Sequence, residues 1–580
     1  MRLLLSLCTV LVAQAAFRPL PTFDPASIKP AMFEDTELDL PYYLVHFPRL
    51  ANAVVEDGPN RGFIAISVWR NAKDNQPYNA RIMENILSLA FFYTTKRPWN
   101  PYYGAPGLRD RLEAALAFWG KTQAPSGAFS EYKPQGWNLA ATAFATKFMG
   151  QTLRLLEKAP PIDPDLLAGV QAAQRKAIRF VLTDPAFFEH GRNYSNQFTN
   201  VWPGALAWLS QRKDPEIEAL LRQRIAESAT EFQSPAGYFY EAGGPDWAYN
   251  FGTHHSNLLG AWFYTKGTAL GKHFIEEERR FFDWVSWNVV PEGKEWVLNR
   301  GVETRRAMSV VDFSYRHPLA EHVPVARAFI PTREEAQRQT EAQRRHLAAT
   351  WPKVDPLPVG EFTAFSPYVF LHREQAEYLP TAREKQEAGA LIPAVARQNF
   401  THQRMDSRHP AVFTYIRRPG YYAAFNSGKQ ITRQQRLGLG LLWTPTAGTL
   451  LQSQTNSADA AWGTRLPNSE QVFEAAALDA AYSTGAPSPG ARDLKGNVVT
   501  IDYPLGSSGK KRVVFERDAI RVTVDHPGDF TEQIPSLGTG LQLHPAPASV
   551  TESGTEIAGK RLRILRLAAK DRLEYEIRLR

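Results

Sequence analysis

The sequence predicts a multidomain α+β protein, in which an incomplete helical (α/α) toroid is followed by an antiparallel β-sandwich. From about residue 82 to residue 351, apolar residues recur at the spacing of helices. Past about residue 393 they alternate with polar residues, as in half-buried strands. Pro- and Gly-rich loops separate the helical segments, which indicates stacked helical hairpins. No strict repeat is visible, so a closed or partly closed toroid is favoured over a regular solenoid.

The first 16 residues have the layout of a secretory signal: Arg2, an apolar run from Leu3 to Val12, then small residues at a cleavage site. The apolar run is too short to span a bilayer, and no later stretch reaches the roughly 20 apolar residues that a span needs. We therefore expect a periplasmic or secreted protein without membrane insertion. Cys8, the single cysteine, would be removed with the signal, so disulfides cannot support the mature fold.

Two domains are expected after the signal, a helical domain over residues 17–390 and a β domain over residues 391–580. One face of a helix carries Ile82, Ile86, Leu89 and Tyr93, while Ile520, Val522 and Val524 alternate with polar neighbours. The periodicity changes gradually, so the boundary can lie anywhere from about Gln375 to Asn399. We place it near Gly389 or Ala390.

The formal net charge of +8 favours a polyanionic partner. The sequence has no basic run, zinc motif or RNA-binding signature, so an acidic polysaccharide fits an exported chain better than nucleic acid. Fourteen Trp and 21 Tyr residues offer flat faces on which sugar rings can stack. Ordinary core packing and a charge that serves solubility are the alternative explanations.

Three stretches of the helical domain are too polar and too Gly-rich for ordinary helix faces. They are residues 193–200 (NYSNQFTN), residues 237–249 (GYFYEAGGPDWAY), which lead into His254 and His255, and residues 299–306 (NRGVETRR). Loops carried by a rigid scaffold commonly present functional side chains. These three stretches are therefore the candidate site.

Together these stretches resemble the heparinase II/III-like and alginate-lyase-like polysaccharide lyases, which combine an incomplete helical toroid with an antiparallel β-sandwich. Residues 195–197 (Ser-Asn-Gln) resemble an Asn-Asn-His stretch of the alginate-lyase branch, and residues 237–249 resemble a segment that ends in a catalytic tyrosine. Residues 301–305 are similar to a Gly-Arg-x-x-x-Arg stretch, although Arg300 precedes the glycine here. Residues 405–406 (Met-Asp) and 417–422 (RRPGYY) resemble the strands that open the sandwich.

The resemblance implies cleavage of a uronate-containing acidic polysaccharide by β-elimination, which removes the weakly acidic hydrogen at C5 of the sugar. Asn196 and Gln197, with a nearby Arg or protonated His, would stabilise the charge that develops on the sugar carboxylate. Tyr249 would serve as general base and then as acid to the leaving oxygen. Tyrosine in water has a pKa of about 10, so neighbouring groups must supply about 4 kcal/mol for it to act as a base near pH 7.

The residues assigned to these roles should converge on one cleft. The catalytic candidates are Tyr249, Asn196, His254, His255 and His402, and the candidates for substrate binding are Gln197, Asn200, Tyr240, Glu241, Trp247, Arg305 and Arg306. Gln197 stands where the alginate-lyase branch has His and cannot place a positive charge there. His254, His255, His402 and His409 all lie near relevant motifs, so the catalytic histidine stays open.

Each candidate also has a structural explanation: Tyr249 can be a packed aromatic, and His255 and Asn196 can cap helices. The adjacent histidines could indicate a metal site. However, neighbours on a helix point about 100° apart and no Glu or Asp stands at ligand spacing, so neither a metal nor a cofactor is expected.

Two other functions remain open. A glycoside hydrolase on a helical toroid would use Glu241 and Asp246 as its carboxylate pair, but we expect Glu241 to be held by an arginine or by backbone donors. A non-catalytic glycan-binding protein would use its aromatic residues as stacking platforms, although binding alone does not need such a set of titratable residues. The sequence does not indicate the oligomeric state.

Overall fold

The computed structural model describes residues 16–312, 317–455, 460–467, 471–476 and 480–579. The predicted signal, except for Ala16, lies outside the described residues. Two compact units are present. Unit 1 comprises residues 1–184, 204–218 and 339–374, and unit 2 comprises residues 185–203, 219–338 and 375–580.

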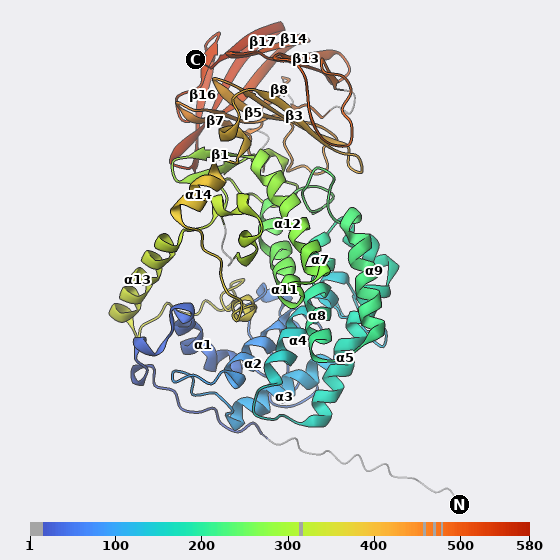
Figure 1. Ribbon diagram of the computed structural model, residues 1–580, viewed down its shortest axis with the longest axis vertical. Helices are drawn as coiled ribbons and strands as arrows, with labels where there is room; N and C mark the ends of the chain where they lie inside the picture. Colours follow the sequence, from blue (N-terminus) through green and yellow to red (C-terminus); the bar gives the residue numbers. More distant parts are fainter. Residues whose placement is uncertain (1–15, 313–316, 456–459, 468–470, 477–479, 580) are drawn as a thin grey trace, which may run out of the picture. The chain divides into compact units, whose positions relative to one another are not determined.

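Unit 1 is helical. Its elements are η1 (Pro25–Ser27), η2 (Pro30–Met32), η3 (Asp35–Glu37), α1 (Leu40–Asn52), η4 (Ala72–Asp74), η5 (Ile82–Asn85), α2 (Ile86–Thr94), α3 (Pro106–Lys121), α4 (Leu139–Leu156), α5 (Pro164–Thr183) and η10 (Pro367–Phe370) (Figure 1). Proline begins α3 and α5, where its missing amide donor costs nothing, and the Asp163 side chain caps α5. Leucine and aromatic side chains of these helices form one continuous core.

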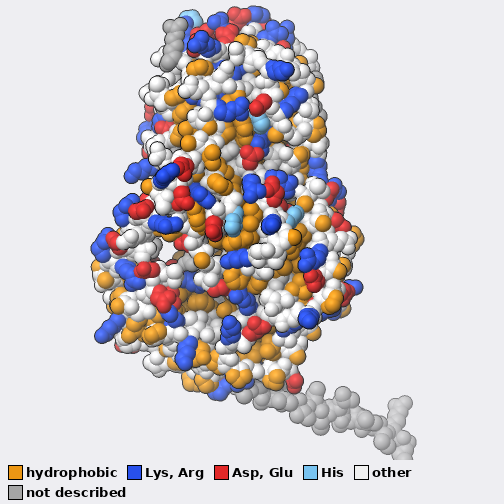
Figure 2. Space-filling model, viewed as in Figure 1, with side chains coloured by type: hydrophobic (Ala, Val, Ile, Leu, Met, Phe, Trp, Pro, Cys, Tyr) orange, Lys and Arg blue, Asp and Glu red, His pale blue; other side chains and the backbone are white. Residues whose placement is uncertain are grey.

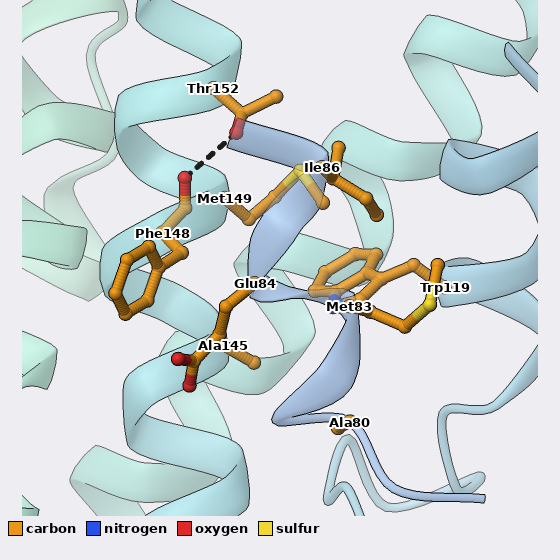
Figure 3. Close-up of a pocket in the computed structure, with 9 residues that line it drawn as sticks. All are labelled: Ala80, Met83, Glu84, Ile86, Trp119, Ala145, Phe148, Met149 and Thr152. Atoms are coloured by element: carbon orange, nitrogen blue, oxygen red, sulfur yellow. Dashed lines mark hydrogen bonds between the residues drawn. The ribbon is translucent and has the colours of Figure 1, made fainter. Parts of the chain in front are cut away.

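A small cavity lies within unit 1 between η5 and α4 (Figure 3). Its volume of about 10 Å³ has room for about one water molecule. Glu84 is the acidic group in its wall, and this carboxylate pairs with Arg81 and accepts a hydrogen bond from Trp69 Nε1 at 2.9 Å. The cavity is too small to hold a sugar.

The helical part of unit 2 contains the three polar stretches. Its elements are α6 (Pro185–Gly191), α7 (Ser195–Phe198), α10 (Trp247–Tyr249), the π-helical turn η6 (Asn250–His254), α11 (His255–Thr265), α12 (Ala269–Trp287), β1 (Val289–Glu292), β2 (Glu295–Leu298), η7 (Arg300–Val302), η8 (Pro318–Glu321), η9 (Pro324–Phe329), α14 (Ala382–Gly389) and α15 (Pro393–Ala396). Helices α8 (Val201–Gln211), α9 (Pro215–Glu231) and α13 (Arg333–Thr350) contain residues of both units.

The rest of unit 2 is a large antiparallel sheet. Its main path runs β10-β12-β13-β14-β7-β6-β5-β4-β3-β11, with β15 and β16 paired to β17, β17 and β8 paired to β14, and β9 paired to β8. The strands are β3 (Phe400–Asp406), β4 (Ala411–Arg418), β5 (Tyr421–Gly428), β6 (Gly438–Thr444), β7 (Gly448–Gln452), β8 (Gly463–Arg465), β9 (Val472–Phe473), β10 (Ala481–Tyr482), β11 (Gly490–Asp493), β12 (Val499–Leu505), β13 (Gly509–Phe515), β14 (Ala519–Leu537), β15 (Gln542–His544), β16 (Ser549–Ile557) and β17 (Lys560–Arg578).

The two ends of this sheet are buried differently. Strands β12 and β13 alternate buried and more exposed residues, whereas β4 and β5 are buried along their whole length. One face of β4 contributes Val412 and Ile416 to the core of the sheet. On its other face, Trp284 of α12 lies edge-on to Phe413 with ring centres 4.6 Å apart. Trp284 also packs against Tyr238 and Trp247, so it connects the polar stretch 237–249 to the sheet.

The predicted fold class is confirmed: a helical N-terminal part precedes an antiparallel β part. Helix gives way to strand between α15 and β3, but the compact units divide the chain elsewhere, so the domain boundary at residue 390 stays a prediction. No helix in the described part of the chain is long and apolar enough to cross a bilayer. Positive and negative side chains are interspersed on the face shown in Figure 2.

Candidate functional site

A tight loop before α10 brings the three polar stretches together within unit 2. Ala242 and Gly243 adopt positive φ angles of 52° and 82°, a conformation that is strained for alanine by about 1 kcal/mol or more. A Cβ atom at Gly244 would lie 2.5 Å from Thr304 Cγ2, so a side chain there would force the loop away from residues 299–306. Backbone hydrogen bonds join Gly243 to Asn193 (3.2 Å) and Thr304 to Pro245 (2.9 Å).

Glu241 lies at the centre of these contacts. Its carboxylate accepts hydrogen bonds from the Arg305 guanidinium and from the Asn196 side-chain amide, and the residue is 0% exposed. Burial raises the pKa of Glu241 to about 8, against the opposing effect of Arg305. The expected arginine contact is present. Asn196 is also buried, and its amide is directed at Glu241.

Asp246 caps the helix that carries Tyr249. Its side chain accepts hydrogen bonds from the backbone N–H groups of Tyr249 (2.9 Å) and Arg306 (2.7 Å). Burial raises the pKa of Asp246 to about 6. The π-helical turn η6 follows directly after Tyr249, and such turns often occur at functional sites. Asp246 thus fixes the backbone of Tyr249 relative to that of Arg306.

Tyr249, Arg305 and Arg306 face solvent at least in part. Arg306 Nη2 donates a hydrogen bond to the Tyr249 hydroxyl oxygen at 2.9 Å, and the guanidinium carbons of Arg305 and Arg306 lie 4.9 and 4.8 Å from the ring centre. Arg305 also lies 5.6 Å from the ring centre of Tyr194. Two phenols and two guanidinium groups therefore form an accessible, positively charged surface, which we call the arginine–tyrosine surface (Tyr194, Tyr249, Arg305 and Arg306).

The three predicted catalytic histidines do not lie on this surface. His254 stacks on Phe239 with ring centres 3.5 Å apart, and burial lowers its pKa to about 3. His402 stacks on Trp287 with ring centres 3.7 Å apart, and burial lowers its pKa to about 4. His255 Nδ1 lies 2.6 Å from Glu278 Oε1, and both side chains are buried. Since His254 and His402 are neutral at neutral pH, neither supplies positive charge to a substrate.

Besides Glu241, three of the predicted substrate contacts are buried. The Tyr240 hydroxyl donates to Asp406 at 2.7 Å, and its 1% exposure leaves it no access to a sugar. Trp247 is fully buried with its indole N–H 3.2 Å from the Asn299 carbonyl, so it offers no stacking platform. The Asn200 amide donates to the Asn196 carbonyl at 2.6 Å. These contacts support the loops and do not reach solvent.

Gln197 is partly exposed and contacts His190, which in turn stacks on Tyr194. The sequence prediction included neither His190 nor Tyr194 among its site residues. His190 Nε2 lies 3.1 Å from Gln197 Oε1, and the His190 ring stacks on Tyr194 with centres 4.8 Å apart. His409 packs beside the loop at Gly243 and is half-buried. His190 and Tyr194 are four residues apart at the end of a helix, and this spacing in the sequence could have indicated their contact. His409, by contrast, is one of the four histidines that the sequence left open as the catalytic one, and it lies in the turn after β3.

A separate group in this unit has the residue types of a metal site. One ligand atom each from His255, Glu278 and His317 lies within 4.8 Å of the other two, and all three residues are buried. Glu278 comes from α12, 23 residues beyond His255, which is why a search for nearby ligand spacing in the sequence does not find it.

Comparisons with known proteins bear on the fold. No protein-family model and no curated protein sequence matches the chain. Among solved structures, the chondroitin AC lyase of Streptomyces coelicolor A3, determined with chondroitin sulphate, aligns with 96% of this chain and 80% of its own at a TM-score of 0.51 and 12% identity. Another chondroitinase AC lyase aligns with 94% of this chain and 83% of its own, at a TM-score of 0.47 and 13% identity. A heparinase III aligns with 86% of this chain and 77% of its own, at a TM-score of 0.46 and 10% identity. The chain thus has a fold similar to that of the Streptomyces chondroitin AC lyase.

Proposed function

We propose that this protein is an exported polysaccharide lyase, which cleaves a uronate-containing acidic polysaccharide by β-elimination at the arginine–tyrosine surface. The observation that carries the proposal is the hydrogen bond from Arg306 to the Tyr249 hydroxyl at a solvent-facing position. A guanidinium that donates to this oxygen fixes its position and supplies positive charge beside the group that would exchange a proton with the substrate. The similarity in fold to a chondroitin AC lyase supports the same reaction class.

In the proposed reaction, tyrosinate at Tyr249 removes the hydrogen at C5 of the uronate. The C5–H electrons form a C4–C5 double bond as the bond from C4 to the glycosidic oxygen breaks. Tyr249, now protonated, returns the proton to that oxygen. Arg306 and the exposed part of Arg305 neutralise the substrate carboxylate, whose negative charge increases when C5 is deprotonated. The buried Glu241 and Asn196 hold Arg305 in place.

Glycoside hydrolysis remains the second candidate, because a raised carboxyl pKa suits a general acid and that of Glu241 is raised to about 8. The position of the residue opposes this function. Glu241 and Asp246 are each 0% exposed, and hydrogen bonds hold both side chains. They do not face each other across an accessible gap, which a hydrolase pair must do.

The experiment that tests the function is incubation of the protein with chondroitin, hyaluronan, heparan, alginate and glucuronan. Ultraviolet absorbance and new reducing ends are recorded together. A lyase yields a conjugated, unsaturated uronate in step with each reducing end on at least one of these polymers. New reducing ends without the chromophore would indicate hydrolysis, and tight binding without either product would indicate a glycan-binding protein.

A further inference from the structure

We propose that His255, Glu278 and His317 form a binding site for a divalent transition-metal ion of the zinc type. Two imidazoles and one carboxylate are a donor set that zinc accepts. The inference concerns a site apart from the arginine–tyrosine surface and does not depend on the proposed lyase activity.

The three side chains converge on one point. His255 Nδ1 and His317 Nε2 lie 2.6 Å and 3.2 Å from the same atom, Oε1 of Glu278. Ligands of a tetrahedral zinc ion, at bond lengths of about 2.1 Å, lie about 3.4 Å apart. The His317 distance is close to this value, and the His255 distance must open by about 0.8 Å to admit an ion.

Glu278 is a buried carboxylate, and a nearby cation would stabilise its negative charge. The carboxylate is 0% exposed, and the imidazoles of His254, His255 and His317 interact with it electrostatically. The rings of His255 and His317 stack with centres 4.3 Å apart, so two imidazolium charges would repel each other strongly. Glu278 Oε2 is buried and has no hydrogen-bond partner in the described part of the chain. A divalent ion would supply a positively charged partner for this oxygen.

The site would join three separate segments of unit 2. His255 begins α11, Glu278 lies in α12, and His317 immediately precedes η8. His255 also directly follows η6, the π-helical turn after Tyr249. A metal ion here would therefore stabilise the start of α11, which η6 connects to Tyr249.

Metal content is the direct test. The protein is purified without a polyhistidine tag, stripped with EDTA, dialysed against Zn²⁺ or Co²⁺ and analysed by mass spectrometry of its metals. We expect about one ion per chain, visible d–d absorption bands of tetrahedral Co²⁺, and an unfolding temperature several degrees above that of the stripped protein. Glu278→Gln and His317→Ala should each remove the bound ion.

The matched control is His273→Ala, because His273 forms a similar pair with Glu277 on the same helix, with 3.2 Å between Nε2 and Oε1. This variant should keep one ion per chain. The Co²⁺ spectrum is measured on the unaltered protein, so this part of the test does not depend on whether a variant folds. No d–d bands and no shift in unfolding temperature would overturn the proposal and leave a hydrogen-bonded His–Glu–His cluster. An unchanged metal content in Glu278→Gln and His317→Ala, with folding confirmed by circular dichroism, would also overturn it.

Discussion

Tyr249 and Tyr194 both lie beside the guanidinium of Arg305, and Arg306 donates a hydrogen bond to the hydroxyl of Tyr249. Under the proposed function, this difference favours Tyr249 over Tyr194 as the group that transfers the proton. Replacement of Tyr249 by Phe should lower kcat on the order of 1,000-fold, because loss of a general acid–base group typically costs 100-fold to 10,000-fold. The rate of chromophore formation measures the effect.

Tyr194→Phe is the matched control, because it removes a second partly exposed phenol next to the same arginine. It should lower kcat by less than about tenfold, since it removes no proton-transfer group. Both variants should unfold at the temperature of the unaltered protein. If Tyr194→Phe stops turnover and Tyr249→Phe does not, the roles of the two tyrosines are reversed.

Glu241 should make the stability of the protein depend on pH in a defined direction. Its pKa is raised to about 8 in the folded protein from a model value of 4.5, so the folded state binds more protons than the unfolded state between these values. The stabilisation is complete below about pH 4.5 and is lost as the pH rises toward 8. Glu241→Gln lacks this effect. The unfolding temperature of the variant, measured relative to that of the unaltered protein, should therefore increase as the pH rises from 5 to about 8.

Thermal unfolding at pH steps across this window checks the prediction. Asp502→Ala, which removes an exposed partner of Arg512, should run parallel to the unaltered protein over the same range. A difference between Glu241→Gln and the unaltered protein that does not vary with pH would show that Glu241 stays ionised when folded.

Residue type and clustering in the sequence were enough to select Tyr249, Arg305 and Arg306. They were not enough to show which side chains face solvent. Asn196 was predicted to bind the substrate carboxylate, but its amide is directed at the buried Glu241, a partner 45 residues away. His402 likewise pairs with Asp493, 91 residues away. Such long-range partners decide burial and charge, and no local pattern specifies them.

At the scale of elements, Asp406 at the end of β3 anchors the strand-like segment that leads to Glu241. Its carboxylate accepts hydrogen bonds from the hydroxyls of Ser234 (2.5 Å), Tyr238 (2.9 Å) and Tyr240 (2.7 Å), all of them buried. Asp406→Ala should lower the free energy of unfolding by roughly 3 kcal/mol or more, because three buried hydroxyls lose their acceptor. Urea denaturation measures this loss.

The exposed ion pair of Asp502 and Arg512 gives the comparison within the same sheet. Asp502→Ala should cost about 1 kcal/mol or less, as surface ion pairs do. Equal losses for Asp406→Ala and Asp502→Ala would mean that the three hydroxyls find other partners, and that Asp406 does not hold the loop.

Periodicity in the sequence predicts whether an element is a helix or a strand, but it does not predict which other elements cover its faces. The alternating pattern correctly indicated a strand at Ile520, Val522 and Val524, which are buried at the start of β14 and alternate there with less buried residues. In β4 and β5 both faces are buried, and polar or charged residues such as Arg417 and Arg418 are buried with them. Arg418 donates to backbone carbonyls, including that of Phe400 at 2.7 Å. Burial of this kind follows from packing against other elements, which the pattern of one strand does not contain.

At the scale of the whole molecule, the net charge of +8 favours a polyanionic substrate. Added salt screens charges over about 10 Å at 0.1 M and about 3 Å at 1 M. The ratio kcat/KM on a long uronate polymer should therefore fall several-fold as NaCl rises from about 0.05 to 0.5 M. A tetrasaccharide of the same polymer should show a smaller decrease, because it carries fewer charges.

Initial rates on polymer and tetrasaccharide, measured in parallel, check this prediction. Circular dichroism at each salt concentration controls for unfolding. A kcat/KM on the polymer that does not change with salt would indicate that the positive charge serves solubility alone.

Product analysis in water enriched in oxygen-18 tests the central claim, β-elimination, most directly. Elimination breaks the bond between C4 and the glycosidic oxygen without adding water, whereas hydrolysis adds one water molecule across the bond. After brief digestion of a polymer that the protein cleaves, mass spectrometry should find unsaturated oligosaccharides that lack one water and carry no oxygen-18 from the cleavage step. Saturated products that each contain one oxygen-18 atom would contradict elimination and would favour hydrolysis through Glu241 and Asp246.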